Sequence, residues 1–394
     1  MTYRLYYNDA YLTDFDAMLV EIADGGRRVY LDRTAFYPTS GGQPFDTGTR
    51  GGSRVVDVVD EETRIAHLLD APLDVKAGRV QAHVDWPRRF DHMQQHTGQH
   101  LLSAVLEDLF GWKTVSVHFG PAASTLDVDT DAVPHARLVA AEDRANLLIA
   151  ENRGVTAQME NAASATGLRK PTDRTGEIRV VTVADVDRSA CGGTHVRTTG
   201  EIGVLLVRRT EKVKQGTRIE FVCGLRAASR ARADYDALSS IAQAVSGSVD
   251  DAAAVVKGRL AAGQEAEAAR RKAARELDGY HARERVLAAA ADARGVRRVI
   301  ERRAEGALDD LRGLAHAVCA LPRTAFIGAV EGAGAVLVGT SEDSGLAAGS
   351  VLRPALEAAG GRGGGSPRMA QGAVPAGNIT SVIDAVQAEW DRAT

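Results

Sequence analysis

The chain has 394 residues, 44% of them hydrophobic and 25% charged, with a formal net charge of −4. This composition is that of a globular protein with two to four domains, and so mild a charge does not by itself indicate a nucleic-acid partner. No run of about eighteen apolar residues occurs and the N-terminus lacks a signal peptide's regions, so we expect a cytoplasmic protein that does not enter a membrane.

From residue 3 to about residue 86, short β-like runs alternate with Gly, Asp and Pro turns, which predicts a small all-β domain. Inside it, the segment TAFYPTSGGQPFDTG at 34–48 contains Gly41 and Gly42, which permit backbone conformations and close approaches that side chains forbid. From local sequence alone, an ordinary hairpin loop remains a sufficient explanation of this segment.

The segment DHMQQHTGQH at 91–100 places imidazoles at helical intervals before the apolar run LLSAVLEDLF. We expect Asp91 to cap this helix and Gly111 to end it. His96 and His100, four residues apart, project from one face and can bind one ion, whereas His92 lies about 12 Å from His100 along the axis and cannot join them. The core-facing stripe is expected to comprise Leu101, Leu102, Val105, Leu106 and Leu109.

Two alternating strands follow, TVSVHFG and STLDVDT, joined by a turn. Alternation puts Ser116 and His118 on one face and the valines on the other. If the polar face lines the site, both side chains are available to a substrate. Further elements are expected to be an amphipathic helix at 134–153, a strand after it, and two strands within 203–224.

A second candidate ligand pair occurs in CGGTH, where two glycines between Cys191 and His195 predict a tight turn after the strand-like run IRVVTVADVD. Together with His96 and His100 it supplies three imidazoles and a thiolate, a set that suits Zn²⁺. We therefore expect one zinc ion per chain. The odd number of widely spaced cysteines argues against a disulfide framework.

After residue 225 the composition shifts to Ala, Arg and Glu, which predicts a pair of long antiparallel helices interrupted at Gly247 and Gly263. Residues 270–303 contain eleven Lys or Arg against five Asp or Glu, which fits a solvated helix face or a phosphate-binding or dimer surface. Strands and helices resume after residue 309. Among them, GGRGGGSPRMAQGAV is expected to offer backbone N–H groups and the charges of Arg362 and Arg368 to an anion.

This mixed order favours an α+β fold. The segments RRFDHMQQHTGQHLLS and ACGGTHVRTTGEIG, with TAFYPTSGGQPFDTG, RIEFVCGLRA and GGRGGGSPRMAQGA, resemble the editing domain of alanyl-tRNA synthetases and free-standing alanyl-tRNA editing (AlaX-type) proteins. The Gly-rich segment is similar to the DHHA1 domain, without the acidic DHH motif of phosphoesterases. With no aminoacylation domain before Met1, the resemblance implies a free-standing editing protein of the long type.

The resemblance implies four domains: a β-barrel-like domain at 1–88, a zinc-dependent editing domain at 89–225, a helical hairpin at 226–303 and a DHHA1-like domain at 304–394. It implies a hydrolase that removes serine or glycine from mischarged tRNA(Ala), with a possible homodimer through the C-terminal half. Gly41, Gly42 and Gln43 would contact the tRNA acceptor end, and Arg362 and Arg368 would add tRNA contacts. Ser116 and His118 are the candidates for catalysis and for binding a serine hydroxyl.

Two other functions fit parts of the pattern. A zinc metalloprotease is disfavoured because HTGQH lacks the glutamate of HExxH. A non-catalytic tRNA-binding module with a structural zinc remains an alternative, because four protein ligands close a zinc site whereas three leave a position for water or substrate.

Overall fold

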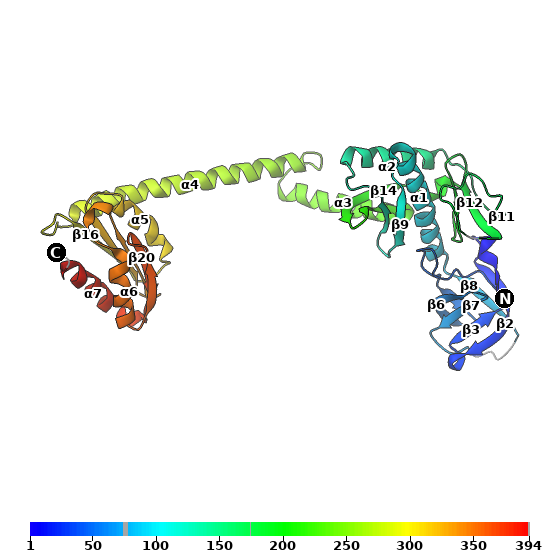
Figure 1. Ribbon diagram of the computed structural model, residues 1–394, viewed down its shortest axis with the longest axis horizontal. Helices are drawn as coiled ribbons and strands as arrows, with labels where there is room; N and C mark the ends of the chain where they lie inside the picture. The colour runs from blue at the N-terminus through cyan, green and yellow to red at the C-terminus, as the bar shows by residue number, and fades with distance from the viewer. Residues whose placement is uncertain (74–77, 174, 393–394) are drawn as a thin grey trace. The chain divides into compact units, whose positions relative to one another are not determined.

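The computed structural model describes residues 1–73, 78–173 and 175–392. Its elements are a mixture of helices and separate sheets, which confirms the predicted α+β class (Figure 1). The chain divides into two compact units, Met1–Ser240 and Ile241–Thr394. Within the described residues, no helix is both long and apolar enough to span a bilayer. The four predicted domains stay a prediction.

The strand-rich N-terminal segment is a closed barrel of order β2-β3-β7-β6-β5-β8. Alternating apolar side chains fill it, as in β8, where every second residue is buried. Its strands are β2 (Asp14–Ala23), β3 (Arg28–Leu31), β5 (Gly48–Arg50), β6 (Ser53–Glu61), β7 (Arg64–Leu69) and β8 (Arg79–Val84). Beside it, β1 (Tyr3–Arg4) pairs with β4 (Arg33–Thr34), and the short helices are η1 (Leu5–Tyr7) and η2 (Asp24–Gly26).

The histidine-bearing helix α1 (Trp86–Phe110) begins after Asp85 and ends at Gly111, whose φ of 71° is left-handed. The predicted cap at Asp91 is wrong: Asp91 lies inside the helix, and its carboxylate pairs with Arg226. The apolar stripe from Leu101 to Leu106 is buried, but Leu109 is exposed because the whole last turn of the helix is only partly covered.

Helix α1 packs between two antiparallel sheets, which fixes where its histidines point. One sheet has the order β14-β15-β10-β9 and shares a core with α1 and α2 (His135–Ala150). The other has the order β11-β12-β13. Their strands are β9 (Thr114–Phe119), β10 (Ser124–Val128), β14 (Leu205–Val213), β15 (Gly216–Cys223), β11 (Val155–Asn161), β12 (Glu177–Val183) and β13 (Asp187–Ala190), with η3 (Thr199–Ile202) beside them.

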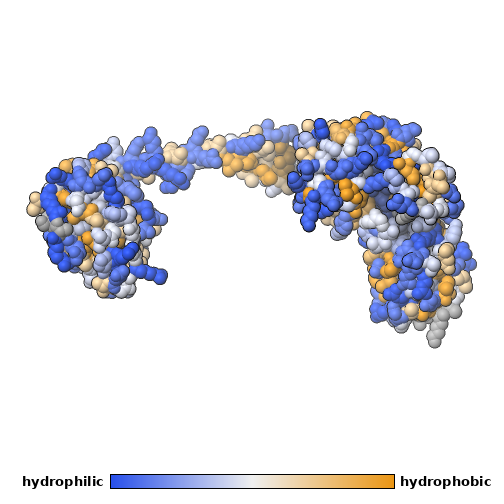
Figure 2. All heavy atoms as spheres, in the orientation of Figure 1, coloured by the Kyte–Doolittle hydropathy of each residue, from blue (hydrophilic) through white to orange (hydrophobic). Residues whose placement is uncertain are grey.

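Two long helices follow, α3 (Gly224–Ala244) and α4 (Ala252–Ala288). Gly247 lies in the break between them, but Gly263 lies inside α4, so the second predicted interruption is wrong. One glycine costs a helix only about 1 kcal/mol, which its Ala- and Arg-rich surroundings offset. Hydrophilic residues cover the C-terminal half of α4 on the face drawn in Figure 2.

The helical prediction for residues 289–303 is also wrong, because β16 (Arg297–Arg303) is a strand parallel to β17 (Thr324–Val330). The sequence signal for this strand was the β-branched pair Val299 and Ile300, which follows a left-handed turn at Gly295. The sheet has the order β16-β17-β18-β20-β19, with α6 and α7 packed on one face and α5 on the other. The remaining bounds are β18 (Ala335–Thr340), β19 (Arg362–Gly365), β20 (Met369–Ala373), α5 (Asp309–Cys319), α6 (Ala348–Ala358), α7 (Ile379–Arg392), η4 (Glu342–Ser344) and η5 (Ala376–Asn378).

The Gly-rich segment is a strand hairpin rather than an open anion-binding loop. Gly363 of β19 pairs with Gly372 of β20, and a Cβ on either residue would meet Leu356 of α6 within 2.6 Å. These glycines therefore let the paired strands β19 and β20 pack closely against α6. At its turn, the guanidinium of Arg368 pairs with Glu342.

Candidate metal centre

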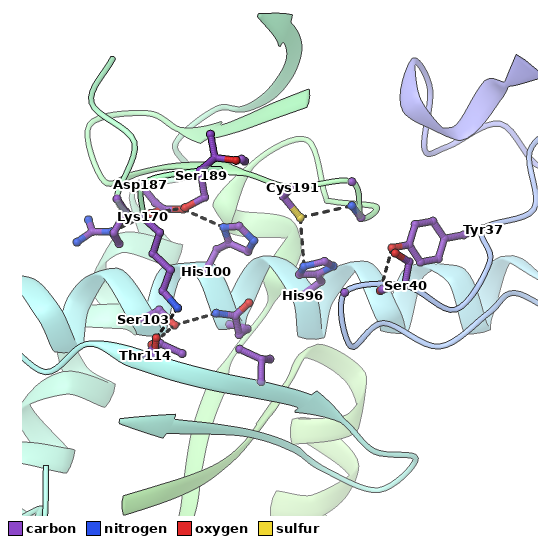
Figure 3. A pocket seen from close by; sticks show the side chains of 18 of the residues that line it. Tyr37, Ser40, His96, His100, Ser103, Thr114, Lys170, Asp187, Ser189 and Cys191 are labelled. Carbon is purple, nitrogen blue, oxygen red and sulfur yellow. Dashed lines mark hydrogen bonds and ion pairs between the residues drawn. The ribbon is translucent and has the colours of Figure 1, made fainter. Parts of the chain in front are cut away.

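Four side chains from two parts of the chain, α1 and the CGGTH turn, converge beneath a pocket. His96 and His100 come from α1, Cys191 directly follows β13, and His195 ends the CGGTH turn. One ligand atom from each lies within 4.8 Å of the others. The Cys191 Sγ is 3.4 Å from His96 Nε2 and 3.3 Å from His195 Nε2. Figure 3 shows His96 and His100 projecting from one face of α1 toward Cys191.

Each histidine is oriented by a partner on its other ring nitrogen. The Nδ1–H of His96 donates to Gln43 Oε1 at 2.8 Å, and that of His100 donates to Asp187 Oδ2 at 2.8 Å. The Thr97 hydroxyl donates to the Met93 carbonyl, so its oxygen accepts from His195 Nδ1–H at 3.1 Å. All three rings therefore present Nε2 to the centre, which is how protein groups prepare histidine ligands for a metal.

Burial and neighbouring charge set the protonation of the cluster. Burial opposes ionisation of Cys191, but the adjacent rings of His96 and His195 outweigh it and hold the pKa of the thiol well below its ordinary value. Burial, aided by His96, lowers the pKa of His195 to about 3. Burial also acts against protonation of His100, yet its hydrogen bonds to Asp187 and Cys191 prevail and raise its pKa to about 10. A metal that binds Nε2 of His100 must therefore displace a proton.

The donor set fits a tetrahedral metal ion. Zinc–sulfur and zinc–nitrogen bonds of ordinary length at tetrahedral angles separate the ligand atoms by about 3.5 Å. The two sulfur–nitrogen distances, 3.3 and 3.4 Å, are close to that value. His92 is absent from the group, although it is buried on the same helix. This group of four could hold a metal ion, as the sequence spacing predicted.

Arg179 and Gly193 hold the CGGTH turn in place. The Arg179 guanidinium is buried, and it donates to the carbonyls of Cys191 at 3.0 Å and Gly193 at 2.8 Å. A Cβ on Gly193 would lie 2.1 Å from Cε1 of His96. Glycine is therefore required at this position because the turn passes directly against a ligand ring.

The glycine-containing loop approaches the cluster differently from the prediction. Gln43 is turned inward: Oε1 accepts from His96 and from the Thr194 N–H at 3.1 Å, and Nε2 donates to Thr194 Oγ1 at 2.8 Å. Its amide supports the candidate ligand His96 and the CGGTH turn. The direct contact of Gln43 with tRNA stays a prediction. Gly41 lines the pocket, and a Cβ added to Gly42, whose φ is 86°, would lie 3.2 Å from the Val117 carbonyl oxygen.

A fully buried ion pair fixes this loop to α1. The Asp46 carboxylate accepts from Arg89 at 3.0 Å and from the Tyr37 N–H at 2.6 Å. The same guanidinium donates to the carbonyls of Ala10 and Ala35. These contacts tie the barrel, the loop and α1 together, and thereby set the distance between Gln43 and His96.

The pocket is a cavity of about 580 Å³ whose floor is α1. Three of the four cluster residues line it, and His195 does not. Tyr37 and Ser40 stand at one end, and Ser103, Thr114 and Lys170 stand at the other (Figure 3). The other cations of its lining are Arg4, paired with Asp60, and Arg169, which bonds to Asp187 at 2.8 Å.

Ser116 and His118 lie away from the pocket, contrary to the prediction. Both are exposed on β9, and the Ser116 hydroxyl donates to Asp127 on the neighbouring strand at 2.8 Å. The apolar face carries Val117 into the pocket wall instead. A register shift opposite Val115 then brings Thr114 onto that same face. Their placement gives no support to a catalytic role for either predicted residue.

Comparison with known proteins finds a family match that includes part of the site, and several similar proteins. Residues 178–220, which include Cys191 and His195, match the family described as Threonyl and Alanyl tRNA synthetase second additional domain. The chain is 37% identical to alanyl-tRNA editing protein AlaX-L of Pyrococcus horikoshii over 58% of its length, and 38% identical to alanyl-tRNA editing protein Aarsd1 of Bos taurus over 51%. It is 32% identical to alanine–tRNA ligase of Pyrobaculum neutrophilum over 98%.

These matches confirm the predicted resemblance to alanyl-tRNA editing proteins and to alanyl-tRNA synthetase. The aligned regions span 60%, 46% and 44% of those three relatives' own lengths, in the same order. The chain thus corresponds to about half of the curated proteins that it matches.

Proposed function

We propose that this protein is a trans-editing hydrolase that deacylates mischarged tRNA(Ala), with serine or glycine as the amino acid removed. The observation that carries the proposal is the buried group of three histidines and a cysteine, opening into a cavity, in a chain similar to alanyl-tRNA editing proteins. Such an enzyme answers a physical need. A site shaped for alanine cannot strongly reject serine, which adds a hydroxyl, or glycine, which lacks a methyl group.

The metal that we propose is one Zn²⁺ ion per chain, held by His96, His100, Cys191 and His195. Three imidazoles and a thiolate are ligands that zinc prefers over harder cations. When bound, zinc would supply a positive charge beside the ester, which positions and polarises it. Each of the three histidine ligands has its own anchor in this chain, since Gln43, Asp187 and Thr97 fix the ring orientations.

The surrounding residues would bind the substrate and limit water. The open side of the cavity beside Tyr37, Ser40 and Gly41 would admit the terminal adenosine, because Gly41 has a left-handed backbone and nothing within 4 Å of the position of a Cβ. Arg4, which lines the cavity and is paired with Asp60, would face the phosphates of the acceptor end.

The C-terminal unit would contribute tRNA affinity and dimerisation. Its exposed arginines, including Arg362 of β19, and the basic C-terminal half of α4 support this assignment. We also retain the four-domain division at residues 88, 225 and 303, with a DHHA1-like last domain. Arg226 pairs with Asp91 of α1, so the first turns of α3 act structurally with the editing half.

A non-catalytic tRNA-binding module with structural zinc is the second candidate. The observation in its favour is that four protein side chains can complete a tetrahedral shell and leave no open position. Against it, three of those side chains line a cavity of about 580 Å³, a space suited to a small organic group.

The test is deacylation of tRNA(Ala) charged with serine, glycine or alanine by the full-length protein. We expect hydrolysis of the seryl or glycyl ester, or both, well above the rate without protein, and slow hydrolysis of alanyl-tRNA(Ala). Tight binding of all three charged tRNAs without hydrolysis of any would favour the non-catalytic module.

A further inference from the structure

Part of the connection between β11 and β12 forms one wall of the cavity. We call residues 169–172 the wall segment; all four line the cavity, and none belongs to a helix or strand. The backbone N–H of Arg169 donates to the Arg188 carbonyl at 2.8 Å, and the Lys170 ammonium donates to the Thr114 carbonyl. Figure 3 shows Lys170 extending to Thr114. Because the wall segment lies outside the strand ladders, its side chains contribute to holding it in place.

The guanidinium of Arg169 connects this wall to two other elements. Its Nε–H donates to Asp187 Oδ1 at 2.8 Å and an Nη2–H donates to the Val186 carbonyl at 2.7 Å, where β13 begins. Its Nη1 donates to Asp108 Oδ1 at 2.9 Å and to Glu107 Oε2 at 3.3 Å, both in the last turn of α1. The Arg169 side chain is only 18% exposed. One planar fork of donors therefore joins the cavity wall, β13 and α1.

Asp187 carries this connection to a candidate metal ligand. Its Oδ1 accepts from Arg169, and its Oδ2 accepts from His100 Nδ1–H at 2.8 Å. The Ser189 hydroxyl also donates to Oδ2, at 2.9 Å. The Asp187 side chain is 2% exposed, so bulk water cannot easily replace these partners. Because a carboxylate is planar and rigid, the group bound to one oxygen fixes the direction of the other. The orientation of the His100 ring therefore depends on Arg169 as well as on Asp187.

We propose that Arg169 is a positioning residue that couples the wall of the cavity to the metal ligand His100. With Arg169 on Asp187, the wall segment is closed and the His100 ring is aimed at the metal; with Arg169 detached, both are released together. This inference rests on the proposed function, and within it on the zinc site. Such coupling is reciprocal: the factor by which the attached wall strengthens zinc binding is the factor by which zinc stabilises the attached wall. Metal loading therefore favours the closed cavity in which the ester would be held.

The first experiment measures the zinc affinity of the full-length protein by competition with a chelator of known affinity. Arg169→Ala should raise the zinc dissociation constant about 10-fold, the low end of the range for an outer partner, because Ser189 still donates to Asp187. If Arg169 acts through Asp187, the same substitution made in the Asp187→Asn protein should change that constant by less than about twofold.

Arg208→Ala is the matched control. Arg208 is also mostly covered and paired with a carboxylate, that of Asp234, but it does not line the cavity. Its replacement should leave the zinc dissociation constant at the wild-type value.

The second experiment follows hydrogen–deuterium exchange in peptides that cover the wall segment, in the metal-free and the zinc-loaded full-length protein. In wild type, zinc should slow exchange of the Arg169 amide about 10-fold, the factor that reciprocity requires. The effect of zinc should persist in Arg208→Ala and disappear in Arg169→Ala. A role of Arg169 confined to stability would lower the melting temperature of Arg169→Ala without making this exchange insensitive to zinc.

Three results would overturn the coupling. One is an unchanged zinc affinity in folded Arg169→Ala, and another is an equal loss of affinity from Arg169→Ala with and without Asp187→Asn. The third is exchange of the wall segment that zinc leaves unchanged in wild type, a measurement that needs no variant to fold. Neither experiment uses tRNA, so failure of the coupling leaves the deacylase function standing, and failure of the deacylation assay leaves the coupling standing. A wild-type protein that binds no zinc would refute the metal site and the coupling with it.

Discussion

Replacing Gln43 by leucine should weaken metal binding although Gln43 contacts no metal. The side chain makes three hydrogen bonds: its carbonyl oxygen accepts from His96 Nδ1–H and the Thr194 N–H, and its amide donates to Thr194 Oγ1. Leucine has a similar size but makes none of them. His96 then loses the partner that fixes its tautomer, and because Gln43 is only 1% exposed, bulk water cannot easily replace that partner.

Loss of an outer partner of this kind raises a metal dissociation constant about 10- to 100-fold, or about 1.4 to 2.7 kcal/mol of binding free energy. Competition between the metal-free protein and a chelator of known zinc affinity measures that constant directly. Gln43→Glu should bind nearly as well as wild type, because a carboxylate oxygen can still accept from the imidazole.

Gln94→Leu provides the control, since Gln94 is a buried glutamine of α1, the helix that carries His96, and among the described residues its amide donates only to the Glu201 carbonyl. Its zinc affinity should match that of wild type. A dissociation constant for Gln43→Leu within twofold of wild type, in a folded protein, would refute the view that Gln43 acts by orienting His96.

Three further predictions concern the residues that hold the candidate metal centre in place and a buried histidine of the barrel. Gly193→Ala should abolish stoichiometric metal binding, measured by elemental analysis, because its Cβ would displace the His96 ring; full occupancy would contradict this. Asp46→Asn should lower the free energy of unfolding, measured by urea denaturation, by about 3–5 kcal/mol, because it leaves the Arg89 charge buried without its counter-ion. Asp16→Asn breaks an exposed ion pair and should lower the free energy of unfolding by less than about 1 kcal/mol. Burial, followed by the charge of Arg50, lowers the pKa of His67 to about 3, so the unfolded chain takes up a proton below about pH 6.5 and the folded chain does not. The contribution of His67 to the free energy of unfolding should therefore be constant above pH 6.5 and fall by up to about 1.4 kcal/mol per pH unit below it. A His67→Gln variant whose free energy of unfolding falls as steeply with acid as that of wild type would contradict this assignment.

The four candidate ligands were predictable because their geometry is local. The four-residue spacing of His96 and His100 sets one helix face, and the two glycines of CGGTH require a turn. Each pair is short enough that no knowledge of the fold was needed. Only the approach of the two pairs to one another depends on the fold, and there the expectation came from the donor set, because three imidazoles and a thiolate together suit zinc.

The anchoring residues could not be predicted in the same way. Gln43 reaches His96 from 53 residues away, and Asp187 reaches His100 from 87 residues away. Arg179 is only 12 residues before Cys191, but it contacts that turn from the neighbouring strand, and nothing in the sequence around any of the three distinguishes it from a surface polar residue. The expected position of Ser116 and His118 beside the pocket was wrong, because strand alternation defines two faces without saying which one faces the site. Thr114 was missed because a register shift, which no local pattern announces, turned it inward.

The most direct test of the account measures metal content and hydrolysis on the same preparations. Full-length protein is stripped with a chelator, divided, and reconstituted with increasing zinc, and single-turnover hydrolysis of Ser-tRNA(Ala) and Gly-tRNA(Ala) is followed at each step. We predict that hydrolysis of at least one of the two rises in proportion to bound zinc and saturates at one ion per chain. Full activity in the metal-free protein, or none at one bound zinc per chain, would contradict a zinc-dependent deacylase.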